Sequence, residues 1–89
     1  MKTTIEKIAK ELNIRKDTLI KKINEFISND EKILNIEFVL RSDEKQTSSY
    51  NIYTNKRKFK MRIKNVPVKN SKFNRAYVEC NDFISSERR

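Results

Sequence analysis

The chain of 89 residues carries a formal charge of +9, with 37% charged and 36% hydrophobic residues. It has no histidine, no glycine and one cysteine, which excludes an imidazole base, a Cys/His zinc cluster and a glycine-rich phosphate loop. The length suits a single small domain with one core, and we expect it to be non-enzymatic and without cofactors. No long apolar run or leader pattern is present, so we expect a cytoplasmic protein with no membrane span.

The first predicted element is an amphipathic helix that begins near Thr4. Its apolar residues recur at helical spacing on one face: Ile5, Ile8, Ala9 and Leu12. Thr3 and Glu6 have the spacing of a capping box, in which both side chains accept hydrogen bonds from backbone N–H groups at the helix start.

A second amphipathic helix is predicted after Asn13. Its apolar residues fall within one arc of a helical wheel: Leu19, Ile20, Ile23, Phe26 and Ile27. The polar segment "SNDEK" ends it at residues 28–32. Two short helices cannot bury both apolar faces alone, so a sheet, or a second copy of the chain in a homodimer, must cover them.

From Ile33 the hydrophobic period changes to two, which predicts a β-hairpin over residues 33–54 with a polar turn in "SDEKQTS". In its first strand we expect four apolar residues to face the core: Leu34, Ile36, Phe38 and Leu40.

A second hairpin is predicted over residues 56–80. Its first strand alternates apolar and basic residues until Pro67 interrupts it, with Phe59, Met61 and Ile63 on the inner face. In its second strand, Ala76, Val78 and Cys80 face inward, and Cys80 acts there as a small hydrophobe.

Positive charge is concentrated in this second hairpin. Residues 56–75 hold nine Lys and Arg and no Asp or Glu, so their charge equals the net charge of the whole chain. Segregation of one sign onto one region produces a local field that attracts polyanions. The pattern of this segment predicts a strand and not an amphipathic helix. Nucleic acid is therefore favoured over a membrane surface as its binding partner.

The run "IAKELNIRKDTLIKKI", residues 8–23, resembles the helix-turn-helix of bacterial and phage DNA-binding regulators. Ala9 supplies the small residue where the second helix crosses close, and Asn13 takes a turn position usually held by left-handed glycine. Apolar residues follow at the spacing of the family: Ile14, Leu19 and Ile23. With the hairpin at 33–54, residues 3–54 resemble a winged helix-turn-helix of phage and plasmid regulatory or replication proteins.

The resemblance implies an α+β fold of the winged helix-turn-helix type, in which two N-terminal helices precede an antiparallel sheet of two hairpins. One domain over residues 1–89 would contain a helix-turn-helix at 3–32, a wing-like hairpin at 33–54, a basic hairpin at 56–80 and a C-terminal tail at 81–89.

The resemblance also implies a duplex-DNA site, because in this family the second helix lies in the major groove. Carried over position by position, the DNA-binding residues of that helix are Arg15, Lys16, Thr18, Lys21 and Lys22. Arg15 or Lys16 suits guanine O6 and N7, whereas Asp17 would repel phosphate unless it accepts from cytosine N4 or only caps the helix.

The basic hairpin is expected to hold phosphates without reading sequence. Its candidates are Lys56, Arg57, Lys58, Lys60, Arg62, Lys64 and Lys72. The alternative interpretation is an edge strand that lysines protect against aggregation. Tyr53 and Tyr77, on the polar sides of their strands, are candidates for base stacking.

Three hypotheses follow from the sequence, and duplex DNA is favoured over a single strand. The leading hypothesis is a regulator of transcription or replication, on a mobile element, that binds duplex DNA through the helix-turn-helix and the basic strand. The second is binding of single-stranded DNA or RNA across the basic sheet, with structural helices. The third is a protein-interaction module that docks an acidic partner.

Overall fold

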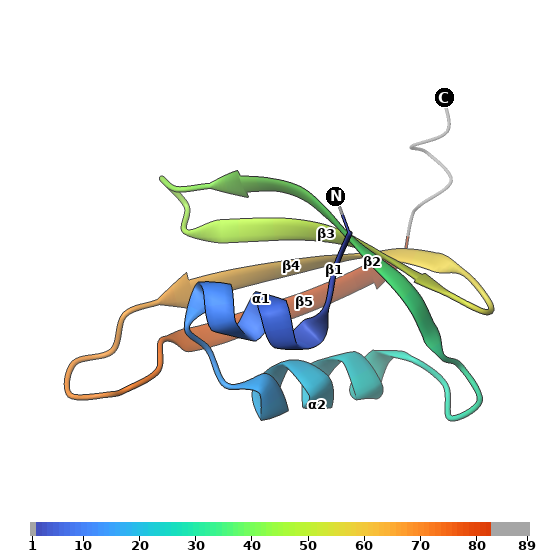
Figure 1. Cartoon of the computed structure of the whole chain (residues 1–89), viewed down its shortest axis with the longest axis horizontal. Helices are drawn as coiled ribbons and strands as arrows, with labels where there is room; N and C mark the ends of the chain where they lie inside the picture. The colour runs from blue at the N-terminus through green and yellow to red at the C-terminus, as the bar shows by residue number, and fades with distance from the viewer. Residues whose placement is uncertain (1, 83–89) are drawn as a thin grey trace.

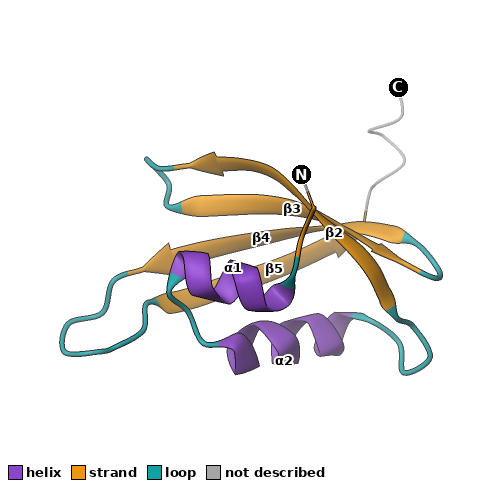
Figure 2. Cartoon of the chain, viewed as in Figure 1, coloured by secondary structure: helices purple, strands orange, loops and turns teal. Residues whose placement is uncertain are grey.

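The computed structural model describes residues 2–82, which form one antiparallel sheet with two helices packed against one of its faces (Figure 1, Figure 2). The elements are β1 (Lys2–Thr3), α1 (Ile5–Leu12), α2 (Lys16–Phe26), β2 (Ile33–Ser42), β3 (Thr47–Thr54), β4 (Lys58–Val66) and β5 (Arg75–Asp82). The five strands follow one another across the sheet in chain order.

The predicted α+β class is therefore confirmed, with two helices followed by two hairpins. The hairpins are joined into a single sheet, because β3 pairs with β4 over seven residues. The short strand β1 adds a fifth strand that the sequence pattern did not predict. Residues 81 and 82 of the predicted tail belong to β5, and the remainder of that tail lies outside the described residues.

Helix α1 begins at Thr4, whose side chain accepts a 3.1 Å hydrogen bond from the Lys7 backbone N–H. The capping box predicted from Thr3 and Glu6 is wrong by one residue. Thr3 instead lies in β1, paired with Ile36 of β2, so its backbone is extended.

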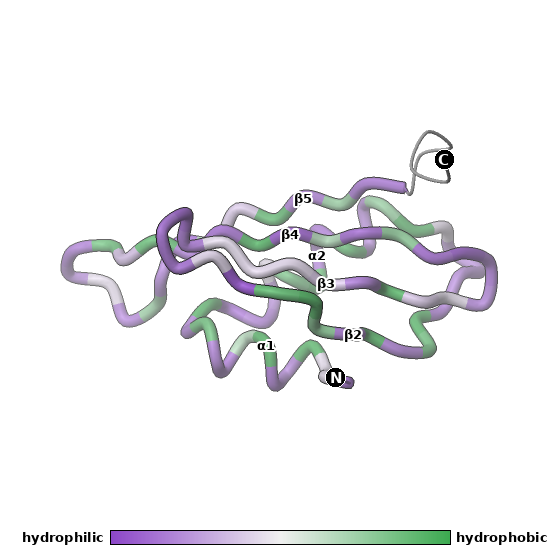
Figure 3. Tube along the Cα trace, turned by 90° about the horizontal axis from the view of Figure 1, so that it is seen from above, coloured by the Kyte–Doolittle hydropathy of each residue, from purple (hydrophilic) through white to green (hydrophobic). Residues whose placement is uncertain are grey.

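The core lies between the helices and the inner face of the sheet. Strands β3 and β4 bury every second residue, which is the signature of strands covered on one face. Figure 3 shows hydrophilic and hydrophobic positions following one another along β4. The core residues are Ile8, Ala9, Leu12, Ile14, Leu19, Ile23, Ile36, Tyr50, Ile52, Phe59, Met61 and Ile63. The sheet thus covers the apolar faces of both helices within a single chain.

Strand β2 departs from the predicted alternation. Register shifts occur between Ile33 and Asn35 and between Phe38 and Leu40. They leave Leu34 68% exposed and Leu40 53% exposed, so the prediction that these two residues face the core is wrong. A period-two pattern assumes an uninterrupted ladder, and each extra residue reverses the faces that follow it.

Candidate nucleic-acid interface

The basic side chains of β4 lie on the face of the sheet that points away from α1 and α2, here called the open face. They alternate with the buried residues Phe59, Met61 and Ile63, as the sequence predicted. We call the following four residues the basic rail: Lys58, Lys60, Arg62 and Lys64. Alternate residues on a strand are about 6.6–7 Å apart, so the rail extends over roughly 20 Å.

Polar side chains of the two neighbouring strands flank the rail. On β3, the residues opposite the rail are Tyr53, Asn51, Ser49 and Thr47, in the order Lys58 to Lys64. On β5, Asn81 lies opposite Lys60, Glu79 opposite Arg62 and Tyr77 opposite Lys64. The rail is therefore the central column of a surface rich in hydrogen-bonding groups.

Tyr53 is held in place on this face by two contacts. The Lys58 Nζ lies 5.6 Å from the centroid of its ring, and its hydroxyl donates a 3.2 Å hydrogen bond to Glu37 Oε1. Partial burial and this bond to the Glu37 carboxylate raise the pKa of Tyr53 above its usual range. The phenol is therefore neutral at physiological pH and presents an uncharged ring beside a cation.

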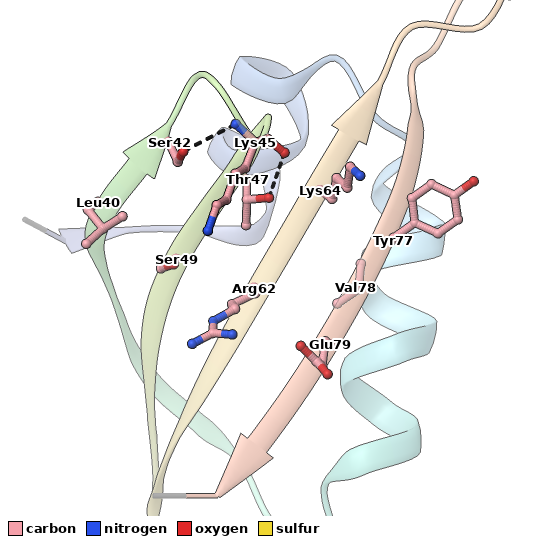
Figure 4. A pocket seen from close by; sticks show the side chains of 10 residues that line it. All are labelled: Leu40, Ser42, Lys45, Thr47, Ser49, Arg62, Lys64, Tyr77, Val78 and Glu79. Atoms are coloured by element: carbon pink, nitrogen blue, oxygen red, sulfur yellow. Dashed lines mark hydrogen bonds between the residues drawn. The ribbon is translucent and has the colours of Figure 1, made fainter. Parts of the chain in front are cut away.

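A groove of about 650 Å³ crosses the open face at the Lys64 end of the rail. Figure 4 shows the side chains that line it, contributed by β2 to β5 and the β2–β3 turn. They are Leu40, Ser42, Lys45, Thr47, Ser49, Arg62, Lys64, Tyr77, Val78 and Glu79. Tyr77 is 54% exposed at the β5 margin, so the groove combines cations with an accessible aromatic ring.

The turn between α1 and α2 contains Asn13 in the left-handed conformation expected at that position. Asn13 adopts a left-handed conformation with φ 54° and ψ 50°, and Ile14 N–H donates to Ala9 O at 3.0 Å. The Asn13 side chain donates to Lys72 O at 3.1 Å, and Asn74 N–H donates to Asn13 O at 2.8 Å. The β4–β5 loop is thereby attached to the turn, which places Lys72 beside it.

Helix α2 is the helix that the resemblance places in the major groove. Some of its basic side chains are engaged in contacts within the protein, and acidic side chains accompany the others. Arg15 stacks on the Phe73 ring, with 5.0 Å from the guanidinium carbon to the centroid, and Lys22 Nζ lies 4.0 Å from Glu25 Oε1. Lys16, Lys21 and Asp17 are exposed, and Thr18 is half-buried. Along α2 itself, three lysines are accompanied by two carboxylates, those of Asp17 and Glu25.

Lys56 and Arg57 lie apart from the rail. Lys56 Nζ pairs with Asp30 Oδ2 at 2.8 Å. Arg57 pairs with Glu31 at 2.9 Å and with Asp82 at 2.8 Å, and donates to Phe26 O at 3.0 Å. Its guanidinium also lies 4.7 Å from the Phe26 ring centroid. These contacts connect the end of α2, the segment before β2 and the end of β5, so Arg57 has a structural role.

Glu31 is the acceptor at the centre of this cluster, and only 1% of its side chain is exposed. Hydrogen bonds from Arg57, from the Thr54 hydroxyl at 2.6 Å and from the Ser28 N–H at 3.0 Å lower its pKa to about 2. The carboxylate is therefore charged throughout the physiological range.

Cys80 faces the core from β5, as predicted. Burial raises the pKa of its thiol to about 11, so the unreactive protonated form predominates at neutral pH.

The structure does not bring the rail and the DNA-binding residues predicted on α2 to one face, although Lys72 of the basic hairpin lies beside the α1–α2 turn. The rail points away from the face on which α2 packs, so a duplex lying along α2 does not also follow the rail. It does bring the rail together with both tyrosines selected from the sequence, Tyr53 and Tyr77.

Sequence reasoning missed several groups on the open face because they are ordinary polar residues in strands. Thr47, Ser49 and Asn51 follow from the alternation of β3 once its pairing with β4 is known. Lys45 and Glu79 line the groove, but neither carries a local signal of that position.

No helix within residues 2–82 is long and apolar enough to cross a membrane. The same residues contain no group of three or more Cys, Asp or Glu side chains that could hold a metal ion. A scan against protein-family models, a search of curated proteins and a search of solved structures each give no match.

Proposed function

We propose that the protein is a non-enzymatic, single-stranded nucleic-acid-binding protein that uses the open face of its sheet. The observation that carries this proposal is the basic rail on a helix-free face, with Tyr53 and Tyr77 at its two ends. A cationic track holds the phosphate backbone, and exposed aromatic rings stack on bases of any sequence.

The position of β4 argues against the alternative interpretation of the lysines. Lysine protects edge strands, whose backbone groups would otherwise pair with other chains. Strand β4 is paired with β3 on one side and β5 on the other, so it has no exposed edge to protect. Four basic residues on one face of an interior strand produce a local positive field that attracts polyanions.

A single strand fits this face better than a duplex. Its bases are unstacked and accessible to tyrosine rings and to the polar side chains beside the rail, whereas the bases of a duplex are enclosed in the stack. The hydroxyl and amide groups of Ser49 and Asn51 add hydrogen bonds that a splayed base can accept or donate.

The test is a competition between single strands and duplexes of equal length, measured by fluorescence anisotropy at two salt concentrations. We expect the single strand to bind more tightly, and the double variant Y53A/Y77A to lose affinity for it. The control variant R15A/K16A, altered on the helix side, should bind it as the wild type does. Tighter binding of duplex, or an effect only of R15A/K16A, would overturn the proposal.

Duplex DNA bound through α2 is the second candidate function. It is favoured by the left-handed turn at Asn13 and by the position of Lys72 beside that turn. In this mode the protein would control transcription or replication, for instance on a mobile element. The R15A/K16A variant distinguishes the two modes, because only duplex binding requires these side chains. Binding of an acidic protein that persists after nuclease treatment would instead favour the third hypothesis.

A further inference from the structure

The groove at the Lys64 end of the rail contains a single carboxylate among its lining residues, that of Glu79. We infer that this groove is a base-reading subsite that selects guanine within a bound single strand, an inference that rests on the proposed function. At about 650 Å³ it has the size of a small-molecule site, with room for one nucleotide.

The hydrogen-bonding pattern of guanine matches the two charged residues at the β4–β5 side of the groove. Arg62 and Glu79 are directly opposite each other on neighbouring strands, and Figure 4 shows both side chains at the groove. An arginine only donates hydrogen bonds, and an ionised carboxylate only accepts them. The Watson–Crick edge of guanine offers the complement: the O6 acceptor followed by the N1–H and N2–H donors.

The other bases match this pair less well. Cytosine and adenine each offer the carboxylate only their amino group, because the ring nitrogen beside it is an acceptor, whereas guanine offers two adjacent N–H donors. Uracil and thymine place their one N–H between two carbonyl oxygens, both of which the carboxylate repels. Specificity of this kind arises because a mismatched edge leaves a charged group without its hydrogen bond.

The remaining groove residues supply contacts without selectivity. The Tyr77 ring offers a stacking surface at the margin, and Lys45 and Lys64 offer charges to the flanking phosphates. A purely structural interpretation is that Glu79 neutralises part of the positive charge of the rail. However, no ion pair between Glu79 and Arg62 is present in the part of the chain that the structure describes.

The experiment measures the affinity of thymidine oligonucleotides of fixed length in which one central base is replaced. We expect the guanine strand to bind about tenfold more tightly than the all-thymine strand, the discrimination typical of one good bidentate contact. Inosine, which lacks the N2 amino group, should be intermediate. 7-Deazaguanine keeps the Watson–Crick edge and should equal guanine. Uridine-based strands with the same substitutions show whether the preference holds for RNA.

The decisive variant is Glu79→Gln, and its matched control is Glu44→Gln. Both substitutions remove one exposed carboxylate, but Glu44 lies in the β2–β3 turn and does not line the groove. We expect E79Q to lose the guanine preference while E44Q keeps it, with both variants folded by circular dichroism. Equal binding of all bases, or equal loss of preference in both variants, would overturn the inference and leave the proposed function intact. Failure to bind any strand would overturn both.

Discussion

The two faces of the sheet use the same strands for different purposes. On the helix side, Phe59, Met61 and Ile63 of β4 are fully buried, and the face is closed by α1 and α2. On the open side, the rail residues between them stay at the surface with polar neighbours. A single alternating segment thus supplies both the centre of the core and the cationic surface. The difference indicates that stability and binding can be altered separately at adjacent positions.

The largest expected effect is on the buried face. Phe59→Ala removes a fully buried ring that lies 4.7 Å, centroid to centroid, from Phe26. It should lower the free energy of unfolding by about 3–5 kcal/mol, as large-to-small core substitutions do. Denaturant titration measures this loss. As the matched control, Lys60→Gln on the open face should change stability by no more than about 0.5 kcal/mol. Equal losses of unfolding free energy in the two variants would contradict the conclusion that one face of β4 supplies stability and the other does not.

The next effect concerns the rail as a unit. Replacement of all four rail residues by glutamine should weaken single-strand binding by at least tenfold at low salt. It should also reduce the slope of log K against log salt by about 3, since each phosphate contact on a single strand contributes about 0.7. Anisotropy titrations over a salt series measure both quantities. A salt slope unchanged by the substitutions would show that the rail does not contact phosphates.

A smaller effect is expected from each tyrosine alone. Tyr77→Ala should cost about 1–3 kcal/mol of binding free energy if a base stacks on its exposed ring. Tyr77→Phe keeps the ring and should retain most of the affinity. Equal losses in the two variants would assign the effect to the hydroxyl and not to stacking.

The last effect appears only when the pH is lowered, and it concerns the cluster around Glu31 on the helix side of the sheet. Because the folded-state pKa of about 2 lies below the usual value of 4.5, this carboxylate stabilises the fold above pH 4.5. That contribution is lost as pH falls from about 4.5 towards 2. Thermal unfolding across this range should show a steeper loss of stability for the wild type than for Glu31→Gln. Parallel pH profiles would show that the cluster does not hold the carboxylate ionised.

The amino-acid pattern was sufficient for both helices and for the four strands β2 to β5, but not for the short strand β1. Helical spacing in α1 and α2 and the alternation in β4 depend on neighbours in sequence, so they could be recognised locally. The rail and its two tyrosines could be predicted for the same reason. The left-handed turn could be predicted from Asn13, a residue type that tolerates that conformation.

Features that depend on distant pairings could not be predicted. The shift that exposes Leu40 reflects how β2 aligns with β3. Leu12 O accepts hydrogen bonds from the side chains of Asn65 and Asn74, more than fifty positions away. Similarly, the sequence neighbours of Arg57 do not indicate that Glu31 and Asp82 pair with it in the fold. From the sequence, Arg57 therefore could not be distinguished from the basic residues of the rail.

The interior position of β4 has a consequence for the thermodynamics of recognition. Backbone hydrogen bonds on both sides fix the spacing of the rail before any ligand arrives. A basic tail would lose backbone entropy on binding, whereas this strand has already lost it on folding. Since a ligand that prefers the native state shifts the unfolding equilibrium by mass action, the melting temperature should rise with the concentration of a bound strand.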